Sequence, residues 1–413
     1  MENPKIRFKG FTKDWEQRRF GEITELKSAS RVHKDEWTSN GVPFYRSSDV
    51  MTAINGTENE KAFISEELYE KLSKVSGKLE EGDILVTGGG SVGNPYIVPD
   101  NKPLYTKDAD LLWIKNKGKF HPYFLYEFFF SPTFRNYLGS ISHVGTIAHY
   151  TITQLSDTPI GLPIFEEQKE VGEYFQSLDR LITLHQRKCE QTKKLKKYML
   201  QKMFPRNGAK VPEIRFDGFT YDWEQRKLNE VAEKICVGFV GTCEKFYTDE
   251  SGIPMYRTGN LNGLSLNRDD LKYVTNEFHQ HNQKSQLKAG DILIARHGDS
   301  GKAVNYENSE EANCLNIVII RPDFKKCNYK FLTNCINSPE CQKHIKSLSA
   351  GSTQAVINTS EIEKLGVVIP ANIDEQNRIA RYFSTLDNLI TLHQRKCDEL
   401  KKMKKYMLQN MFI

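Results

Sequence analysis

Two copies of one unit make up this chain, and this duplication limits its possible folds more than any other feature. The first block, at residues 4–18, reads PKIRFKGFTKDWEQR and returns at 212–226 as PEIRFDGFTYDWEQR. Three further blocks keep the same shift of 208 residues: 81–86 with 289–294, 181–189 with 389–397, and 194–204 with 402–412. Solenoid repeats are only about 20–50 residues long, so the sequence predicts a duplicated domain.

The two copies diverge between these fixed blocks. Residues 87–91 read TGGGS, whereas residues 295–299 read ARHGD. We interpret identical positions as scaffold and shared partner contacts, and divergent positions as those that differ in what each copy recognises. Trp15 and Trp223 are unchanged between the copies. They are therefore predicted to be packing anchors.

Composition places the chain among soluble globular proteins. Its 413 residues suit two domains with connecting structure, and 38% hydrophobic with 27% charged residues is typical of folded chains. No run approaches the roughly 18 apolar residues of a membrane helix, and no apolar region follows the polar N-terminus. We therefore expect no membrane partner and no secretion. A net charge of +5 permits a nucleic acid partner without requiring one.

The 8 cysteines predict a reduced, cytoplasmic protein. None of them forms a Cys-x-x-Cys arrangement. Zinc ligation by Cys236, Cys243, Cys335 and Cys341 would need closer paired spacing and histidine partners, so we expect no metal site.

Residues 167–204 and 374–412 each predict one long helix with a coiled-coil seam. Apolar residues recur three and four positions apart, with polar interruptions at His185, Thr192, Lys196 and their counterparts. The seam comprises Val171, Phe175, Leu178, Ile182, His185, Cys189, Thr192, Lys196, Met199 and Met203, and in the second copy Ile379, Phe383, Leu386, Ile390, His393, Cys397, Leu400, Lys404, Met407 and Met411. Because so narrow a stripe needs a partner helix, we expect the two helices to pack on each other. The remaining sequence, rich in short β-branched runs and glycine turns, predicts compact α+β domains.

Through the order in which these features occur, and their duplication, the chain resembles the specificity subunits of type I restriction-modification systems. The marks are two Phe-x-Gly-Phe-x-x-x-Trp heads, two Gly-Asp-Ile-Leu strands, Glu-Gln at each helix start, and Leu-Ile-Thr-Leu-His-Gln-Arg-Lys inside each helix. The resemblance covers essentially the whole chain. It implies two target-recognition domains, at 1–165 and 206–372, and two spacer helices, at 166–205 and 373–413, packed antiparallel.

The resemblance also implies a function without catalysis in this chain. Each domain would read one half of a bipartite, asymmetric site in double-stranded DNA. The chain would dock two methyltransferase subunits, and motor-nuclease restriction subunits would join that core. No cofactor is expected in this chain, whereas S-adenosylmethionine, ATP and magnesium are implied for the partner subunits.

Two pairs of loops are candidate DNA contacts. The loop after each Gly-Asp-Ile-Leu strand offers hydrogen-bonding groups that suit base edges or phosphates. A second loop follows Pro43-Phe-Tyr-Arg46 and Pro254-Met-Tyr-Arg257, where each arginine could read guanine, hold phosphate or form a surface ion pair. The turn GSTQA at 351–355 fits the family pattern, whereas GTIAH at 145–149 lacks the glutamine. The predicted residues are Arg46, Ser47, Ser48, Thr87, Ser91, Arg257, Thr258, Asn260, Arg296, His297, Asp299, Ser300 and Gln354.

Two alternative functions remain open at this point. Asn94-Pro95-Tyr96 is similar to the Asn-Pro-Pro-Tyr loop of amino-methyltransferases but lacks its second proline, so a self-contained methyltransferase is one alternative. A coiled-coil scaffold that never touches DNA is the other. Gly298-Asp-Ser-Gly-Lys302 fits neither a serine-hydrolase elbow nor a phosphate loop. Finally, the lysine stretches 193–197 and 401–405 are interpreted as solvated helix faces, with phosphate contact or methyltransferase docking as alternatives.

Overall fold

The repeat in the sequence becomes a repeat of secondary structure. The computed structural model describes residues 3–107, 110–141, 149–261, 265–296, 301–349 and 357–413. The chain divides into two compact units, of which unit 1 is Met1–His185 with Arg395–Ile413, and unit 2 is Gln186–Gln394. Each unit therefore contains one α+β domain, a part of the first long helix and a part of the second.

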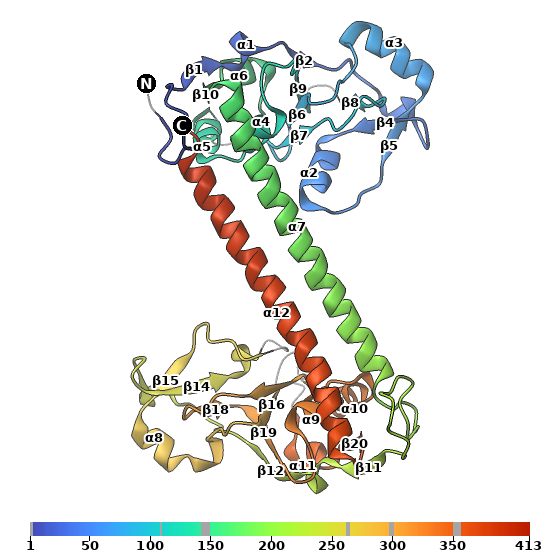
Figure 1. The fold of residues 1–413 in the computed structure, drawn as a ribbon, viewed down its shortest axis with the longest axis vertical. Coiled ribbons are helices and arrows are strands. Elements are labelled where there is room, and N and C mark those ends of the chain that lie inside the picture. Colours follow the sequence, from blue (N-terminus) through green and yellow to red (C-terminus); the bar gives the residue numbers. More distant parts are fainter. Residues whose placement is uncertain (1–2, 108–109, 142–148, 262–264, 297–300, 350–356) are drawn as a thin grey trace. The chain divides into compact units, whose positions relative to one another are not determined.

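Within its described residues, unit 1 contains three sheets, with strand orders β1-β10, β2-β9-β6-β7 and β3-β5-β4-β8 (Figure 1). All pairings are antiparallel except the parallel pair β4–β8. The strands are β1 Glu16–Arg19, β2 Leu26–Ser28, β3 Trp37–Thr38, β4 Val42–Tyr45, β5 Ala62–Ile64, β6 Ile84–Thr87, β7 Pro95–Ile97, β8 Tyr105–Thr106, β9 Leu111–Ile114 and β10 Pro159–Leu162. The helices are α1 Phe20–Ile23, α2 Ser47–Asn55, α3 Glu66–Ser76, α4 Pro122–Phe128, α5 Pro132–Ile141 and α6 Ile152–Asp157.

Unit 2 repeats this topology, with strand orders β11-β20, β12-β19-β16-β17 and β13-β15-β14-β18. Its parallel pair, β14–β18, corresponds to β4–β8. The strands are β11 Glu224–Lys227, β12 Ala232–Val237, β13 Tyr247–Thr248, β14 Ile253–Arg257, β15 Lys272–Val274, β16 Asp291–Ala295, β17 Ala303–Tyr306, β18 Asn313–Leu315, β19 Ile317–Pro322 and β20 Gly366–Ile369. The helices are α8 Asn276–His281, α9 Tyr329–Ile336, α10 Pro339–Ser349 and α11 Thr359–Glu363.

The two long helices are α7 Phe165–Lys202 and α12 Ile373–Asn410, drawn in green and red in Figure 1. Each begins one or two residues before its predicted start and ends two before its predicted end. The chain turns away after α7, where Asn207 and Gly208 adopt positive φ angles. Such angles are incompatible with a continuing α-helix.

The helices pack antiparallel within each unit, through the predicted seam. In unit 1, Lys404 of α12 lies 2.7 Å from Asp179 of α7; in unit 2, Lys196 of α7 lies 2.5 Å from Asp387 of α12. The two ion pairs are related by the 208-residue shift. Most apolar seam residues are buried, whereas His185 and His393 are only half-buried. The lysines that interrupt the seam thus form cross-helix pairs.

The C-terminal end of each long helix completes the hydrophobic core of one unit. In unit 2, Phe204 packs edge-on against Trp223, with ring centroids 6.2 Å apart. In unit 1, Phe412 packs against Trp15 in the same way, at 6.4 Å. Both tryptophans are at most 2% exposed. Their predicted role as packing anchors is confirmed.

The repeated Glu-Gln at the helix starts holds the repeated head segment. Glu375 accepts two hydrogen bonds from Arg215, at 2.7 and 2.9 Å, and one from Trp223 at 3.1 Å. Glu167 accepts the equivalent pair from Arg7. These carboxylates are buried, and a buried charge requires such partners. The sequence identity of these segments therefore reflects a shared scaffold.

Candidate DNA-contacting loops

The first predicted loop follows β6 of the β2-β9-β6-β7 sheet in unit 1 and β16 of the β12-β19-β16-β17 sheet in unit 2. In unit 1, β6 ends at Thr87 and the loop 88–94 leads into β7. The N–H of Tyr150 donates to the carbonyl of Gly88 at 2.8 Å, which joins the segment that begins at Tyr150 to this loop. In unit 2, the N–H of Ile357 donates to the carbonyl of Arg296 at 3.2 Å. The same backbone contact to the loop after the Gly-Asp-Ile-Leu strand thus occurs in both units.

The second predicted loop, which follows Arg46 in unit 1 and Arg257 in unit 2, lies beside the first loop and is held there by a hydroxyl group. Ser47 donates to the carbonyl of Asp110 at 3.0 Å, and the N–H of Gly88 donates to that carbonyl at 2.8 Å. In unit 2, the Thr258 hydroxyl lies 3.5 Å from the carbonyl of Asn316, which directly precedes β19 as Asp110 precedes β9. Three segments therefore meet in each unit: the loop after β6 or β16, the segment that begins at Tyr150 or Ile357, and the loop after Arg46 or Arg257.

The loop after β6 is shaped by its own side chains. Thr87 is fully buried, and its hydroxyl donates to the carbonyl of Ser91 while it accepts the N–H of Asn94 at 2.9 Å. Ser91 itself is exposed. Gly90 and Gly93 adopt left-handed backbone angles that a side chain would strain. Of the two predicted contacts here, Ser91 is presented to solvent and Thr87 is a structural residue.

A neighbouring helix supports this loop in each unit, and sequence reasoning did not identify these supports. Arg135 of α5 donates to the carbonyl of Val92 at 3.3 Å and to Asn94 at 3.1 Å. In unit 2, Gln342 of α10 donates to the carbonyl of Gly301. Arg135 and Gln342 lie at matching positions, each three residues after the first residue of its helix. Because their side chains differ, no repeated motif marked them.

The two predicted arginines form ion pairs within their own domains. Arg46 lies 2.9 Å from Asp49, and Arg257 lies 2.8 Å from Asp270. Burial would raise the pKa of Asp49, but hydrogen bonds from Arg46 and Asn59 outweigh that effect and lower it. The surface ion pair, one of the three roles open for these arginines, is therefore present. Base or phosphate contact by either arginine stays a prediction.

The backbone after these arginines differs between the copies. Ser47 and Ser48 open the two-turn helix α2, and both are partly exposed. After Arg257 there is only a single 3₁₀ turn, from Thr258 to Asn260. Asn260 is buried and accepts the N–H of Arg257 at 2.9 Å, so its amide supports the turn. The copies thus differ in backbone shape where contact with DNA is predicted.

Two predicted contacts, Arg257 and Arg296, have a buried Nε without a hydrogen-bond partner among the described residues, and Arg296 has no ion-pair partner there either. The Arg296 side chain is half-buried. The predicted contacts His297, Asp299, Ser300 and Gln354 lie outside the described residues, as does most of the turn at 145–149.

Asn94-Pro95-Tyr96 is not arranged as an open loop. Pro95 and Tyr96 lie in β7, and the Asn94 amide donates to the carbonyl of Ser91 at 2.7 Å. All eight cysteines are buried and unpaired by disulfides. The described ranges contain no group of three potential metal-ligating side chains, and none of their helices has the length and hydropathy of a membrane span.

Comparisons with known proteins find the same duplication. A family model described as the type I restriction modification DNA specificity domain matches residues 12–194 and again residues 221–402. The type I restriction enzyme MjaVIII specificity subunit of Methanocaldococcus jannaschii is 24% identical over 360 residues, which cover 84% of this chain and 82% of that protein.

Solved structures share the fold over nearly the full length. The S subunit of a type I restriction-modification system from M. genitalium has a TM-score of 0.67 at 14% identity, with 100% of this chain and 99% of that chain covered. A chain from a structure concerned with complex assembly and conformational transition of a type I R-M system has a TM-score of 0.54 at 18% identity, with 96% and 97% covered.

Proposed function

This chain belongs to the family of type I restriction modification DNA specificity domains, and from that premise we propose that each unit reads one half of a bipartite, asymmetric DNA site. One observation carries the proposal. In both units, equivalent hydrogen bonds bring the same three segments together, while the side chains on those segments differ between the units. A common framework with different exposed groups is what two unlike half-sites require.

Chemistry on the DNA would belong to partner subunits. The family supplies DNA specificity, and Pro95 and Tyr96 of the methyltransferase-like tripeptide lie in the β-strand β7. A methyltransferase partner would bring S-adenosylmethionine and extract an adenine from the duplex. Motor-nuclease subunits would bring ATP and magnesium. We place the assembled complex in the cytoplasm, where the reduced state of the buried cysteines is maintained.

Docking of two methyltransferase subunits is supported by an exposed apolar pattern on the long helices. Each unit has two exposed leucines on one helix, and an exposed apolar residue with a tyrosine three positions further on the other. The residues are Leu181, Leu184, Met403 and Tyr406 in unit 1, and Leu389, Leu392, Leu195 and Tyr198 in unit 2, all at least 39% exposed. Repeated exposed apolar groups fit two copies of one partner.

A labelled methyl donor tests where the activity lies. The chain, its methyltransferase partner and genomic DNA should incorporate label only when both proteins are present, at one bipartite sequence. Incorporation by the chain alone would favour a self-contained methyltransferase. A complex that methylates the same sites with and without this chain would favour a scaffold that never contacts DNA.

Docking has its own test. In Leu389→Asp/Leu392→Asp, charged groups replace one of the two proposed docking faces, so native mass spectrometry should find one bound methyltransferase where the wild-type chain binds two. Val240→Asp, at an exposed residue of the domain, is the control and should still bind two. Loss of both partners, or retention of both, from the double variant would contradict this docking face.

A further inference from the structure

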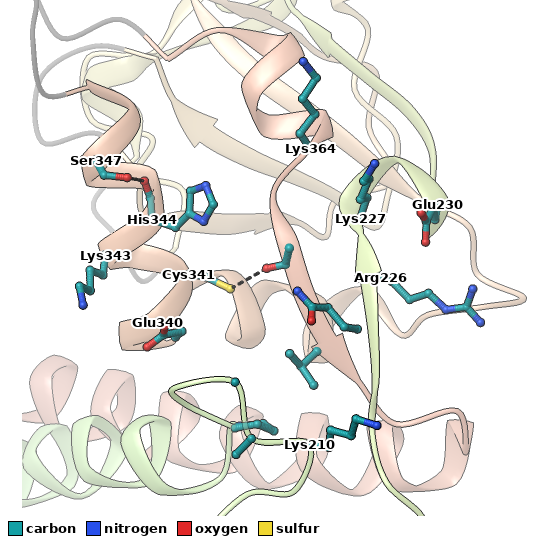
Figure 2. Close-up of a pocket in the computed structure, with 16 residues that line it drawn as sticks. Lys210, Arg226, Lys227, Glu230, Glu340, Cys341, Lys343, His344, Ser347 and Lys364 are labelled. Carbon is teal, nitrogen blue, oxygen red and sulfur yellow. Dashed lines mark hydrogen bonds between the residues drawn. The ribbon is translucent and has the colours of Figure 1, made fainter.

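A basic groove of about 770 Å³ lies in unit 2 between α10, the β11–β20 ribbon and the segment that follows α7 (Figure 2). Figure 2 shows Lys343 and His344 on the α10 side, Arg226 and Lys227 on β11, Lys364 at one end and Lys210 at the other. The charged side chains that line it are Lys210, Arg226, Lys227, Lys343 and Lys364, with Glu230 and Glu340.

Positive charge exceeds negative charge in this groove, and most of it is uncompensated. Arg226 is paired with Glu224 at 2.5 Å. The four lysines are exposed and have no ion-pair partner in the part of the chain that the structure describes. Such a surface attracts an extended anion.

The corresponding surface of unit 1 is neutralised. In the β11–β20 ribbon Lys227 lies opposite Gly366, and in the β1–β10 ribbon Arg19 lies opposite Pro159. Lys364 and Asp157 each lie two residues before these strand partners, so they occupy equivalent positions. In unit 1, Asp157 lies 3.4 Å from Arg19. Arg18, the counterpart of Arg226, has its own carboxylate, Glu22, at 3.3 Å.

The α10 side of the groove is also more basic than the corresponding α5 surface of unit 1. The equivalent helices α5 and α10 begin at Pro132 and Pro339. Asn136 and Lys343 each lie four residues after the first residue of the helix, so Asn136 is the counterpart of Lys343. Two positions that are a lysine in unit 2 are therefore an aspartate and an asparagine in unit 1. Because Arg18 and Arg19 of unit 1 are paired with carboxylates, the excess of positive charge belongs to unit 2 alone, which fits a ligand that one unit binds better than a partner shared by both.

The position of α10 connects this groove with the candidate DNA contacts. Gln342 of α10 holds the loop after β16 at Gly301, and the next two residues, Lys343 and His344, line the groove. Four exposed lysines without ion-pair partners in the described ranges suit phosphates, because each phosphate that a lysine neutralises releases a bound counterion.

We infer that the groove binds the phosphate backbone of DNA beside the half-site that unit 2 reads. This inference rests on the proposed function. The contact is independent of base sequence, because a lysine on a phosphate carries no information about the base. It gives the complex a stronger electrostatic hold on one flank of its site than on the other.

The test replaces two lysines with the residues of unit 1, as Lys343→Asn/Lys364→Asp. The complex of this variant with its methyltransferase partner is titrated with a duplex that carries the methylated site and about one helical turn of flank on each side. Each lost phosphate contact lowers the slope of log K against log salt by about 0.9, so we expect a slope reduced by about 2. The methylated sequence should not change.

Lys288→Asn/Lys325→Asp is the matched control. It makes the same charge change at exposed lysines beside the opposite end of the β16–β19 pair and should leave the slope at its wild-type value. Shortening the duplex to the end of the half-site that unit 2 reads should remove the difference between the groove variant and the wild type. Shortening the other flank should not.

Several outcomes would overturn the inference. These are an unchanged slope in the groove variant, an equal drop in the control, or normal DNA affinity combined with loss of restriction, which would indicate an acidic protein partner. If the wild-type complex shows no preference for its site, the proposed function itself fails, whatever the groove variant does.

Discussion

At the scale of single residues, we propose Arg296 as a base contact. It directly follows β16, its carbonyl accepts the N–H of Ile357, and its side chain is half-buried. A guanidinium at such a position can form a bidentate pair with guanine in the major groove. In unit 1 its place is taken by Gly88, which has no side chain to offer.

We therefore predict that Arg296→Ala weakens binding of the assembled complex to its site by about 1–3 kcal/mol and relaxes the methylated sequence at one base. Binding titrations and methylome sequencing measure both effects. Lys288→Ala changes a cation before the other end of β16 and should leave the methylated sequence intact. An Arg296→Ala complex that still methylates only the original sequence would show that Arg296 reads no base.

Glu127 is a second residue with a distinct environment. It is fully buried in unit 1, where Lys404 lies 2.8 Å away and also contacts Asp179. Desolvation raises the pKa of Glu127 to about 8, although Lys404 opposes that shift. Its counterpart in unit 2 is Asn334. Gln168 accepts the backbone N–H of His121, and Gln376 accepts that of Asn328. Glu127 and Asn334 each lie six residues after these equivalent positions. An amide is thus accommodated at this position.

This pKa predicts a pH dependence of stability. Between the ordinary carboxyl value near 4.5 and about 8, folded Glu127 keeps a proton that the unfolded chain has lost, so the free energy of unfolding falls as pH rises and levels off above 8. Glu127→Gln removes this titration. The free energy of unfolding of the variant minus that of wild type should therefore rise by about 2 kcal/mol between about pH 6 and pH 8.5.

Chemical denaturation at the two pH values measures this difference, with Glu58→Gln, at an exposed loop position, as the control. Equal pH dependence in wild type and Glu127→Gln would show that the carboxyl does not titrate in this range.

Residue roles could be predicted from the sequence only where the two copies agree. The identity of Trp15 and Trp223 indicated packing, and both are buried. Thr87 had the right chemistry for a contact, but its burial depends on how the loop folds back on itself. The support from Arg135 depends on a helix that packs against that loop from 41 residues further along the chain. No local pattern reports such contacts.

At the scale of elements, the two long helices were the most predictable part of the fold. Their stripe of apolar residues recurs over many turns, which is a strong signal. The same spacing placed Lys196 and Lys404 in the seam, but it did not reveal their partners. Asp387 and Asp179 become the partners only once the helices run antiparallel.

This reciprocal pairing predicts the effect of charge reversal. Asp387→Lys places two lysines together in unit 2, so it should destabilise that unit by on the order of 1–2 kcal/mol, given that the pair is partly buried. Adding Lys196→Asp restores opposite charges in swapped positions and should recover most of the loss. Thermal unfolding of the single and double variants gives the coupling energy.

The exposed pair Lys193–Glu190 of α7 is the control. Its reversal should change stability by less than about 0.5 kcal/mol. Additive effects of Asp387→Lys and Lys196→Asp would contradict a helix contact between these two residues.

At the scale of the whole molecule, the duplication, the α+β class and membership of the specificity-subunit family were predicted from sequence and are confirmed. The strand order was not predicted. Strands such as β3 and β8 have only two residues, too few to show a period, and their pairing depends on contacts between distant segments. The α2 helix of unit 1 has only a 3₁₀ turn as its counterpart, so one copy could not serve as a template for the other there.

The most direct test of two separate reading units is an exchange of one of them. Residues 228–370 are replaced with the matching domain of another specificity subunit, and the methylome of a host carrying the hybrid complex is sequenced. We predict that one half of the bipartite sequence changes, while the other half and the gap between them stay the same. A hybrid that is active and changes both halves, or neither, would contradict the assignment of one half-site to each unit.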